Sequence, residues 1–170
     1  SKLFWGNVSS TYKFGIQCSY ELEKLRNQIA NKLTADPEDI IFTSGSSESI
    51  SLVFNRIQDY YRKGIVTISS IEHQASIIAA NRLKNYNWEI KEWVVNNEGI
   101  VKLEYIDHYI YKNVNLVSII WGQSEIGSLQ PVQQIGKRCI ELDILFHIDA
   151  TQILSNGIFN WKSLNCDLLS

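Results

Sequence analysis

Residues 65–84, "IVTISSIEHQASIIAANRLK", place a strand pattern directly before a helix pattern. The first five residues are rich in β-branched side chains, which is typical of a short buried strand, and residues 71–84 are typical of a helix. The same order recurs along the chain. We expect strands at 40–43, 65–69, 88–95, 115–121 and 144–148, and helices over 17–33, 44–63, 71–84, 103–112 and 131–142. Apolar strands that alternate with helices predict an α/β fold with three layers, in which helices flank a mostly parallel sheet.

The composition is that of a globular protein. The chain has 170 residues, of which 45% are hydrophobic and 20% charged, and this length can support one domain with its own core. The formal net charge of -2 provides no excess of basic residues for binding a nucleic acid. No apolar run approaches the ~20 residues that cross a membrane. We therefore expect neither a nucleic acid nor a membrane as a partner.

The three cysteines, Cys18, Cys139 and Cys166, are far apart in the sequence and form no CxxC pair. Their odd number and spacing argue against a disulfide framework and against a zinc site, so we expect no metal. Reduced thiols of this kind indicate a cytoplasmic protein. Buried structural cysteines are the favoured interpretation for all three.

Polar clusters follow four of the expected strands. They are "TSGSSES" at 43–49, "SSIEH" at 69–73, "GQSEIG" at 122–127 and "DATQ" at 149–152. The carboxyl ends of parallel strands lie at one edge of a sheet, where ligands of α/β proteins bind. The sequence contains no GxGxxG, no GxxxxGK[ST], no GxSxG and no HExxH motif, so a dinucleotide site or a P-loop is not indicated.

The first cluster is suited to a phosphate group. Gly45 allows close approach of the backbone, and Ser46 and Ser47 offer hydroxyl and N–H groups where a helix begins. A helix N-terminus carries unpaired donors and the positive end of the helix dipole. The alternative is a plain N-cap, in which Ser46 or Ser47 only satisfies the helix and Glu48 lies in its first turn.

Asp149 stands at the end of an apolar strand. It can cap the following turn together with Thr151. It can also pair with a cationic ring nitrogen, as pyridoxal phosphate requires of an aspartate. Gln152 could then reach the hydroxyl of the same ring, and His73 could stack on the ring or move protons, unless it is an ordinary residue at a helix start. We interpret His108 and His147 as structural.

Four segments resemble the cysteine desulfurases of the class V aminotransferase group, which are fold type I pyridoxal-phosphate enzymes. They are "IIFTSGSSESISL", "SSIEHQASI", "SEIGSLQPVQQIG" and "FHIDATQ", in the family's order. "WGNVSSTYKFG" near the start is similar to a family stretch, with Val8 in place of a proline. The resemblance covers nearly the whole chain.

The resemblance implies a role for each matching residue. Ser46 and Ser47 would hold the phosphate, His73 would stack on the ring and help to protonate intermediates, and Asp149 would pair with the pyridine nitrogen. Gln152 would bond the ring oxygen. Ser124 stands where the family has an asparagine that bonds the same oxygen.

The resemblance also implies the protein's activity and partners. We expect a cysteine desulfurase that removes sulfur from L-cysteine, giving alanine and an enzyme persulfide. The sulfur would pass to an acceptor protein for iron–sulfur cluster assembly or tRNA thiolation, and the enzyme would be a homodimer.

Residues 1–170 are expected to be a partial large domain that binds the cofactor. The family's N-terminal segment, its Schiff-base lysine region, its persulfide cysteine and its small C-terminal domain would lie outside the chain, which alone is expected to be inactive. Two alternatives stay open. One is another class V enzyme, such as a selenocysteine lyase, an aminotransferase or an epimerase. The other is a truncated or degenerate protein without catalysis.

Overall fold

The computed structural model describes residues 6–153 and 161–170. The chain forms two compact units. Unit 1 comprises Ser1–Phe42 and Ile158–Trp161, and unit 2 comprises Thr43–Gly157 and Lys162–Ser170. Each unit is described by itself below.

Unit 1 consists mainly of the helix α1, Lys13–Leu33, followed by the 3-10 turn η1, Pro37–Asp39. α1 confirms the helix that the sequence predicted. It ends at Thr34, whose left-handed conformation (φ 59°) turns the chain back so that the N–H of Ala35 donates to the carbonyl of Ala30 at 2.9 Å.

The strand expected at 40–43 is wrong. These residues are not in a strand, and Ile41 is 74% exposed. Instead, the guanidinium group of Arg26 in α1 donates to the carbonyl of Ile40 and lies 4.9 Å from the ring centre of Phe42. The apolar run indicated a strand, but among the described residues it has no neighbouring strand with which to form a ladder.

Unit 2 is built on a parallel sheet with the strand order β2-β1-β3-β4-β5. Its strands are β1 (Ile65–Ser69), β2 (Glu89–Trp93), β3 (Leu116–Ile120), β4 (Leu145–Asp149) and β5 (Leu168–Leu169). All four pairings are parallel. The structure confirms four predicted strands and adds the short β5, which the sequence did not indicate.

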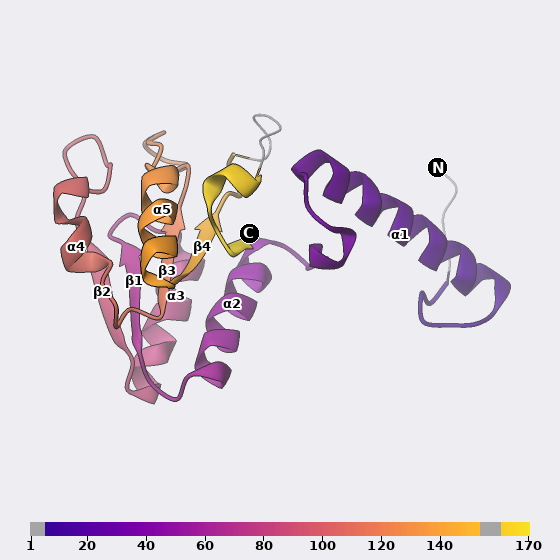
Figure 1. The fold of residues 1–170 in the computed structure, drawn as a ribbon. Coiled ribbons are helices and arrows are strands. Elements are labelled where there is room, and N and C mark those ends of the chain that lie inside the picture. The colour runs from indigo at the N-terminus through magenta and orange to yellow at the C-terminus, as the bar shows by residue number, and fades with distance from the viewer. Residues whose placement is uncertain (1–5, 154–160) are drawn as a thin grey trace. The chain divides into compact units, whose positions relative to one another are not determined.

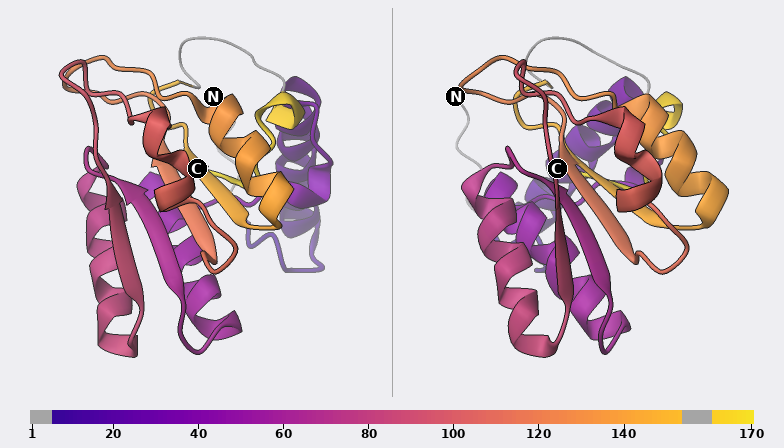
Figure 2. Two further views of the ribbon diagram at one scale, coloured as in Figure 1. Left: turned by 60° about the vertical axis from the view of Figure 1, so that its left-hand side comes forward. Right: turned by 90° about the vertical axis from the view of Figure 1, so that its left-hand side faces the viewer.

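Helices cover both faces of this sheet (Figures 1 and 2). Two of them, α2 (Ser46–Tyr60) and α3 (Gln74–Leu83), pack together on one face. On the other face lie α4 (Ile106–Tyr109) and α5 (Val132–Leu142). Short 3-10 turns complete the unit: η2 (Lys84–Tyr86), η3 (Leu103–Tyr105) and η5 (Trp161–Leu164). This arrangement is the predicted three-layer α/β fold.

The helix expected over 103–112 is shorter than predicted. It begins as the 3-10 turn η3 and continues as the single α-helical turn α4. The hydroxyl of Thr67 on β1 donates to the carbonyl of Tyr109 at 2.7 Å, so a bond to the sheet uses the acceptor that a longer helix would need. Ile110 is then fully buried in an extended conformation.

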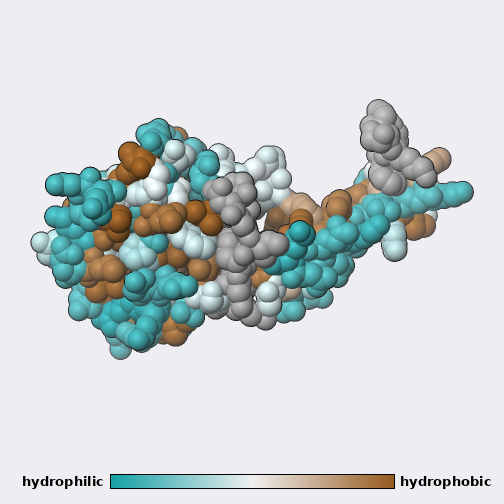
Figure 3. Space-filling model, turned by 90° about the horizontal axis from the view of Figure 1, so that it is seen from above, coloured by the Kyte–Doolittle hydropathy of each residue, from teal (hydrophilic) through white to brown (hydrophobic). Residues whose placement is uncertain are grey.

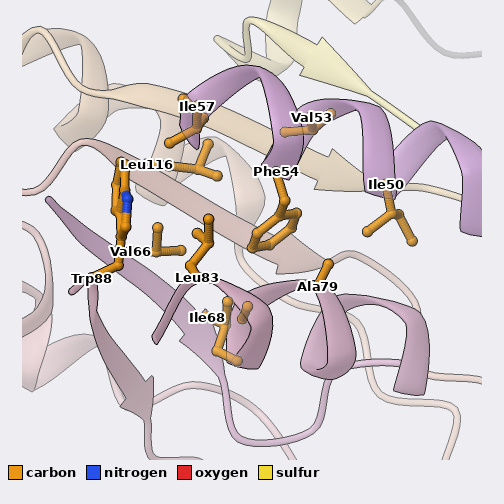
Figure 4. Packing of buried hydrophobic residues seen from close by; sticks show 11 residues of the cluster. Ile50, Val53, Phe54, Ile57, Val66, Ile68, Ala79, Leu83, Trp88 and Leu116 are labelled. Carbon is orange, nitrogen blue, oxygen red and sulfur yellow. The ribbon is translucent and has the colours of Figure 1, made fainter. Parts of the chain in front are cut away.

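The core between the sheet and the α2–α3 layer follows the helical period (Figure 4). α2 contributes residues at spacings of three and four, namely Ile50, Val53, Phe54 and Ile57. They meet Val66 and Ile68 of β1 and Ala79, Ala80 and Leu83 of α3, together with Trp88 and Leu116. The β-branched run at 65–69 therefore lies at the centre of this core.

The order of the strands reverses between β1 and β3. The chain leaves β1 for α3 on one face of the sheet and leaves β3 for α5 on the other face. The two connections diverge at the carboxyl ends of β1 and β3, which is the position where α/β proteins of this topology bind their ligands.

Hydrophobic and hydrophilic residues are mixed on the face that Figure 3 shows. In unit 2, several large apolar side chains are exposed, among them Ile78, Ile126 and Ile140. In the described part of the chain, no helix has the length and apolar character needed to span a membrane.

Replacing Phe54 by alanine is expected to lower the free energy of unfolding by about 3–5 kcal/mol, because its side chain is only 1% exposed and leaves a cavity between α2 and β1. The matched control is Leu52→Ala on the same helix, at a side chain that is 46% exposed, and it should cost less than about 1 kcal/mol. Urea unfolding followed by circular dichroism measures both. Equal losses in the two variants would contradict the packing described here.

Candidate functional site at the carboxyl edge of the sheet

Three adjacent parallel strands, β1, β3 and β4, end at one edge of the sheet. The last register pair of β3 and β4 joins Ile120 to Asp149, and the N–H of Trp121 donates to the carbonyl of Asp149 at 2.8 Å. α2 leads into the amino end of β1, so its N-terminus points to the same carboxyl edge. The predicted polar clusters therefore do gather at one edge.

The start of α2 offers unpaired donors. Gly45 precedes the helix at φ 153°, which L side chains rarely adopt, and an added Cβ would meet nothing within 4 Å. No side chain caps the helix, and the carboxylate of Glu48 accepts from the N–H of Ser44 at 2.6 Å. Ser46 and Ser47 donate no hydrogen bond to any described residue. The alternative of a plain N-cap at these serines is therefore not what the structure has, because Gly45 is the N-cap residue and no side chain caps α2.

His73 lies at the start of α3, as its N-cap residue. Its Nδ1 atom accepts from the N–H of Ala75 at 3.2 Å, which is the helix-start role that the sequence left open. The side chain is exposed, and its Nε2 atom bonds no described residue. The capping bond fixes one edge of the ring and leaves the other edge and the faces accessible.

Asp149 is the last residue of β4 and is only 3% exposed. Its Oδ1 atom accepts from the N–H of Thr151 at 3.1 Å and from the hydroxyl of Thr151 at 2.5 Å, so the predicted capping partner is present. Its Oδ2 atom accepts from no described residue. Gln152 lies exposed in the same turn.

Ser124 lies exposed in the loop after β3. A bridge between Gly122 and Leu129 closes this loop. The side-chain oxygen of Gln123 accepts from the N–H of Glu125 at 2.5 Å and therefore orders the turn around Ser124. The structure places Ser124 at the same sheet edge as Asp149, because β3 and β4 are neighbours. Its role stays a prediction.

Gln130, at the end of this loop, is a buried residue that the sequence argument did not select. Its Nε2 atom donates to the carbonyl of Gly99 at 2.7 Å, and its Oε1 atom accepts from the N–H of Val101 at 2.9 Å. These bonds hold the loop after β3 against the turn that follows β2. Only its place before Pro131 could have drawn attention to it.

Glu72 is a second buried residue at this edge that the sequence did not predict as part of the site. It is 6% exposed, and its Oε1 atom accepts from the hydroxyl of Ser69 at 2.5 Å, from the N–H of Ser69 at 3.3 Å and from the N–H of Ile120 at 2.8 Å. Its Oε2 atom is buried without a partner in the described residues. Burial, with a smaller contribution from the charge of Asp149, raises the pKa of Glu72 to about 7.

His147 is structural, as predicted. It is fully buried on β4, with Nδ1 2.8 Å from the hydroxyl of Ser118 and Nε2 2.8 Å from the hydroxyl of Ser170. Burial lowers its pKa to about 4, and the charge of Asp149 offsets part of this shift. The imidazole is therefore neutral near neutral pH.

The three cysteines are unpaired. Cys18 and Cys139 are buried, and Cys166 is partly buried. Burial raises the pKa of Cys139 and of Cys166 to about 12, which leaves almost no thiolate at neutral pH. These two thiols are poor nucleophiles, in agreement with a structural interpretation.

The carboxyl edge combines complementary groups. Donors at the start of α2 suit an anion, the buried carboxylate of Asp149 suits a cation, and the accessible ring of His73 suits stacking or proton transfer. A planar cationic ring that carries a phosphate group matches all three.

Comparison with known proteins identifies the family. A family model described as Aminotransferase class-V matches residues 1–170. The chain belongs to the class-V aminotransferase family. This member is 34% identical over 169 residues to the mitochondrial cysteine desulfurase of Eremothecium gossypii, covering 98% of this chain and 34% of that protein.

Two further similarities agree with this family. The chain is 36% identical over 170 residues to cysteine desulfurase IscS of Buchnera aphidicola, covering 98% of this chain and 42% of the relative. A solved structure of a NifS-like protein superposes with a TM-score of 0.93 at 28% identity, covering 99% of this chain and 48% of that one. This class-V chain thus spans between about a third and a half of the length of these proteins.

Replacing Glu72 by glutamine is expected to change how stability depends on pH. Between pH 4.5 and about 7, the unfolded chain has released the Glu72 proton while the folded chain retains it. The free energy of unfolding therefore falls as the pH rises through this range. Glu72→Gln lacks this titration. Its free energy of unfolding should therefore rise by up to about 3 kcal/mol relative to that of the unsubstituted chain as the pH increases from 4.5 to about 7.

Urea unfolding of both chains across this pH range measures the difference. His147 contributes the opposite slope, because its lowered pKa makes stability rise between about pH 4 and 6.5, but this contribution is common to both chains and cancels. Stability curves that run parallel in the two chains would show that Glu72 has an ordinary pKa.

Proposed function

We propose that the protein to which this chain belongs is a cysteine desulfurase, which takes sulfur from L-cysteine and leaves alanine. The observation that carries the proposal is the shared edge of the sheet, where unpaired donors of Ser46 and Ser47 and the buried carboxylate of Asp149 both lie. The relatives that bear the name cysteine desulfurase match along nearly the whole chain.

The residues present fit pyridoxal phosphate, the cofactor of this family. The open space in front of Gly45 would admit the phosphate to the donors of Ser46 and Ser47. The carboxylate of Asp149, with Oδ1 held by Thr151, would pair with the ring nitrogen. Ser124 and Gln152 would lie near the ring oxygen.

Each residue would contribute a distinct physical effect. When bound, the cofactor supplies an electron-withdrawing ring that stabilises negative charge on the substrate carbon. Asp149 would keep a proton on the ring nitrogen, since a buried carboxylate favours a neighbouring cation. His73 would cover one face of the ring and accept or donate a proton through Nε2, while Nδ1 stays bonded to the N–H of Ala75.

The chain does not supply every group that the reaction needs. We propose that residues 1–170 form part of the large domain and that the lysine that holds the cofactor and the cysteine that receives the sulfur come from sequence outside these residues. The length of the relatives supports this division. The raised pKa of Cys139 and of Cys166 also makes either thiol an unsuitable nucleophile.

The proposed partners and compartment follow from the same function. The sulfur would pass to an acceptor protein for iron–sulfur clusters or tRNA thiolation, and two copies of the full protein would form a homodimer. Three unpaired cysteines are consistent with a reducing compartment, and we propose the cytoplasm.

The chain is expected to bind pyridoxal phosphate saturably, and Asp149→Asn should weaken that binding at least ~10-fold, because it removes the charge that pairs with the ring nitrogen. Visible absorbance during a titration measures the affinity. The matched control is Asp143→Asn, at the exposed left-handed residue that ends α5, where asparagine fits equally well and affinity should not change.

Borohydride reduction and mass spectrometry of the saturated chain should find no lysine labelled at a single position. A folded chain that shows no saturable binding would overturn the cofactor assignment for these residues. With an added thiol reductant to cleave the persulfide, the complete gene product should release sulfide and alanine from L-cysteine, whereas amino transfer would assign it to another class V activity.

A further inference from the structure

Glu72 lies buried in the turn after β1 and bonds residues at the ends of both β1 and β3. The β1–β3 register ends at the pair of Ile68 and Ser118, two residues before Ile120. Beyond this point the carboxylate of Glu72 replaces a strand carbonyl, since it accepts the N–H of Ile120 at 2.8 Å. It also accepts two bonds from Ser69, the last residue of β1. One buried oxygen atom therefore joins the carboxyl ends of β1 and β3.

His73 follows Glu72 directly in the chain. The turn that carries both residues is held by Glu72 at the sheet and by the bond between Nδ1 of His73 and the N–H of Ala75 at the start of α3. Ser70 adds a backbone bond from its N–H to the carbonyl of Trp93 at 2.9 Å, but that bond lies on the β2 side. Only the Glu72 carboxylate ties this turn to β3, among the bonds of the described residues.

We propose that Glu72 is a positioning residue that fixes the imidazole of His73 relative to the end of β3, where the pyridoxal ring would lie. The proposal rests on the function proposed above, because the position of His73 affects binding only if the pyridoxal ring lies beside it. It assigns the effect to the hydrogen bonds of Oε1, not to negative charge. The partnerless Oε2 atom agrees with this assignment, because no cation or donor in the described residues requires a carboxylate there.

The choice of a glutamate follows from geometry. The side chain must reach back over the turn to Ser69 and across to Ile120 with a single acceptor atom. Glutamine keeps that acceptor at the same distance from the backbone, whereas alanine removes it. Glu72→Gln and Glu72→Ala therefore separate the hydrogen bonds from the charge.

The first test needs no cofactor. In nuclear magnetic resonance spectra of the chain labelled on histidine, the imidazole signals of His73 should shift in Glu72→Ala and keep their original positions in Glu72→Gln. Ser76→Ala is the matched control: Ser76 lies buried in the first turn of α3, and its hydroxyl has no partner in the described residues. A folded Glu72→Ala chain with unchanged His73 signals overturns the proposal.

A milder variant covers the case in which Glu72→Ala does not fold. Ser69→Ala removes one of the three donors to Oε1 and leaves the backbone bonds in place. Its His73 signals should shift in the same direction by a smaller amount. Unchanged signals in a folded Ser69→Ala chain would contradict the proposal.

The second test uses binding of pyridoxal phosphate. His73→Asn removes the ring but keeps an N-cap acceptor for α3. If Glu72 acts through His73, the dissociation constant of Glu72→Ala/His73→Asn should lie within about 2-fold of that of His73→Asn alone. Multiplicative effects of the two changes would show that Glu72 acts independently. If the unsubstituted chain binds no cofactor, the proposed function fails, while the His73 signals still decide the role of Glu72.

Discussion

The parallel pairing of β1 with β3 is the constraint on which the rest of unit 2 depends. These strands are not consecutive in the chain, and β2 occupies the other side of β1. With this pairing, the connections after β1 and β3 lead to α3 and α5 on opposite faces, and they diverge at the carboxyl edge. The pairing also brings together Glu72 and Asp149, which come from different strand–helix connections. The β3–β4 pairing then adds Asp149 to the same edge, and the start of α2 adds Ser46 and Ser47.

The sequence predicted most of the fold because the signals were local. Val66 and Ile68 lie in a β-branched run, and Ile50, Val53, Phe54 and Ile57 follow a helical period. The run at 40–43 carried the same local signal without a partner strand, so the prediction failed there. The clusters at the strand ends could be foreseen, since parallel strands place their carboxyl ends together. The burial of Glu72 could not, because it depends on Ile120, which is distant in sequence.

Burial shifts the pKa of Glu72 and the pKa of His147 in opposite directions. Glu72 holds a proton to higher pH than an exposed glutamate, and His147 releases its proton at lower pH than an exposed histidine. Both shifts arise from removal of water, and the charge of Asp149 influences both groups. The edge therefore keeps one of its carboxyl groups close to neutral while Asp149 ends a strand beside it. Near neutral pH this edge therefore carries less negative charge than two fully ionised carboxylates would give it.

The strand order also has a consequence for how the chain is made. β2 pairs with β1, β3 takes the free side of β1, β4 adds to β3, and β5 adds to β4. Each strand after the first therefore finds a finished neighbour as it leaves the ribosome, and none must wait for a later segment. The paired ends of β1 and β3 form midway through synthesis, and Asp149 joins them when β4 emerges. A nascent chain of unit 2 can thus acquire its site in the order in which it is translated.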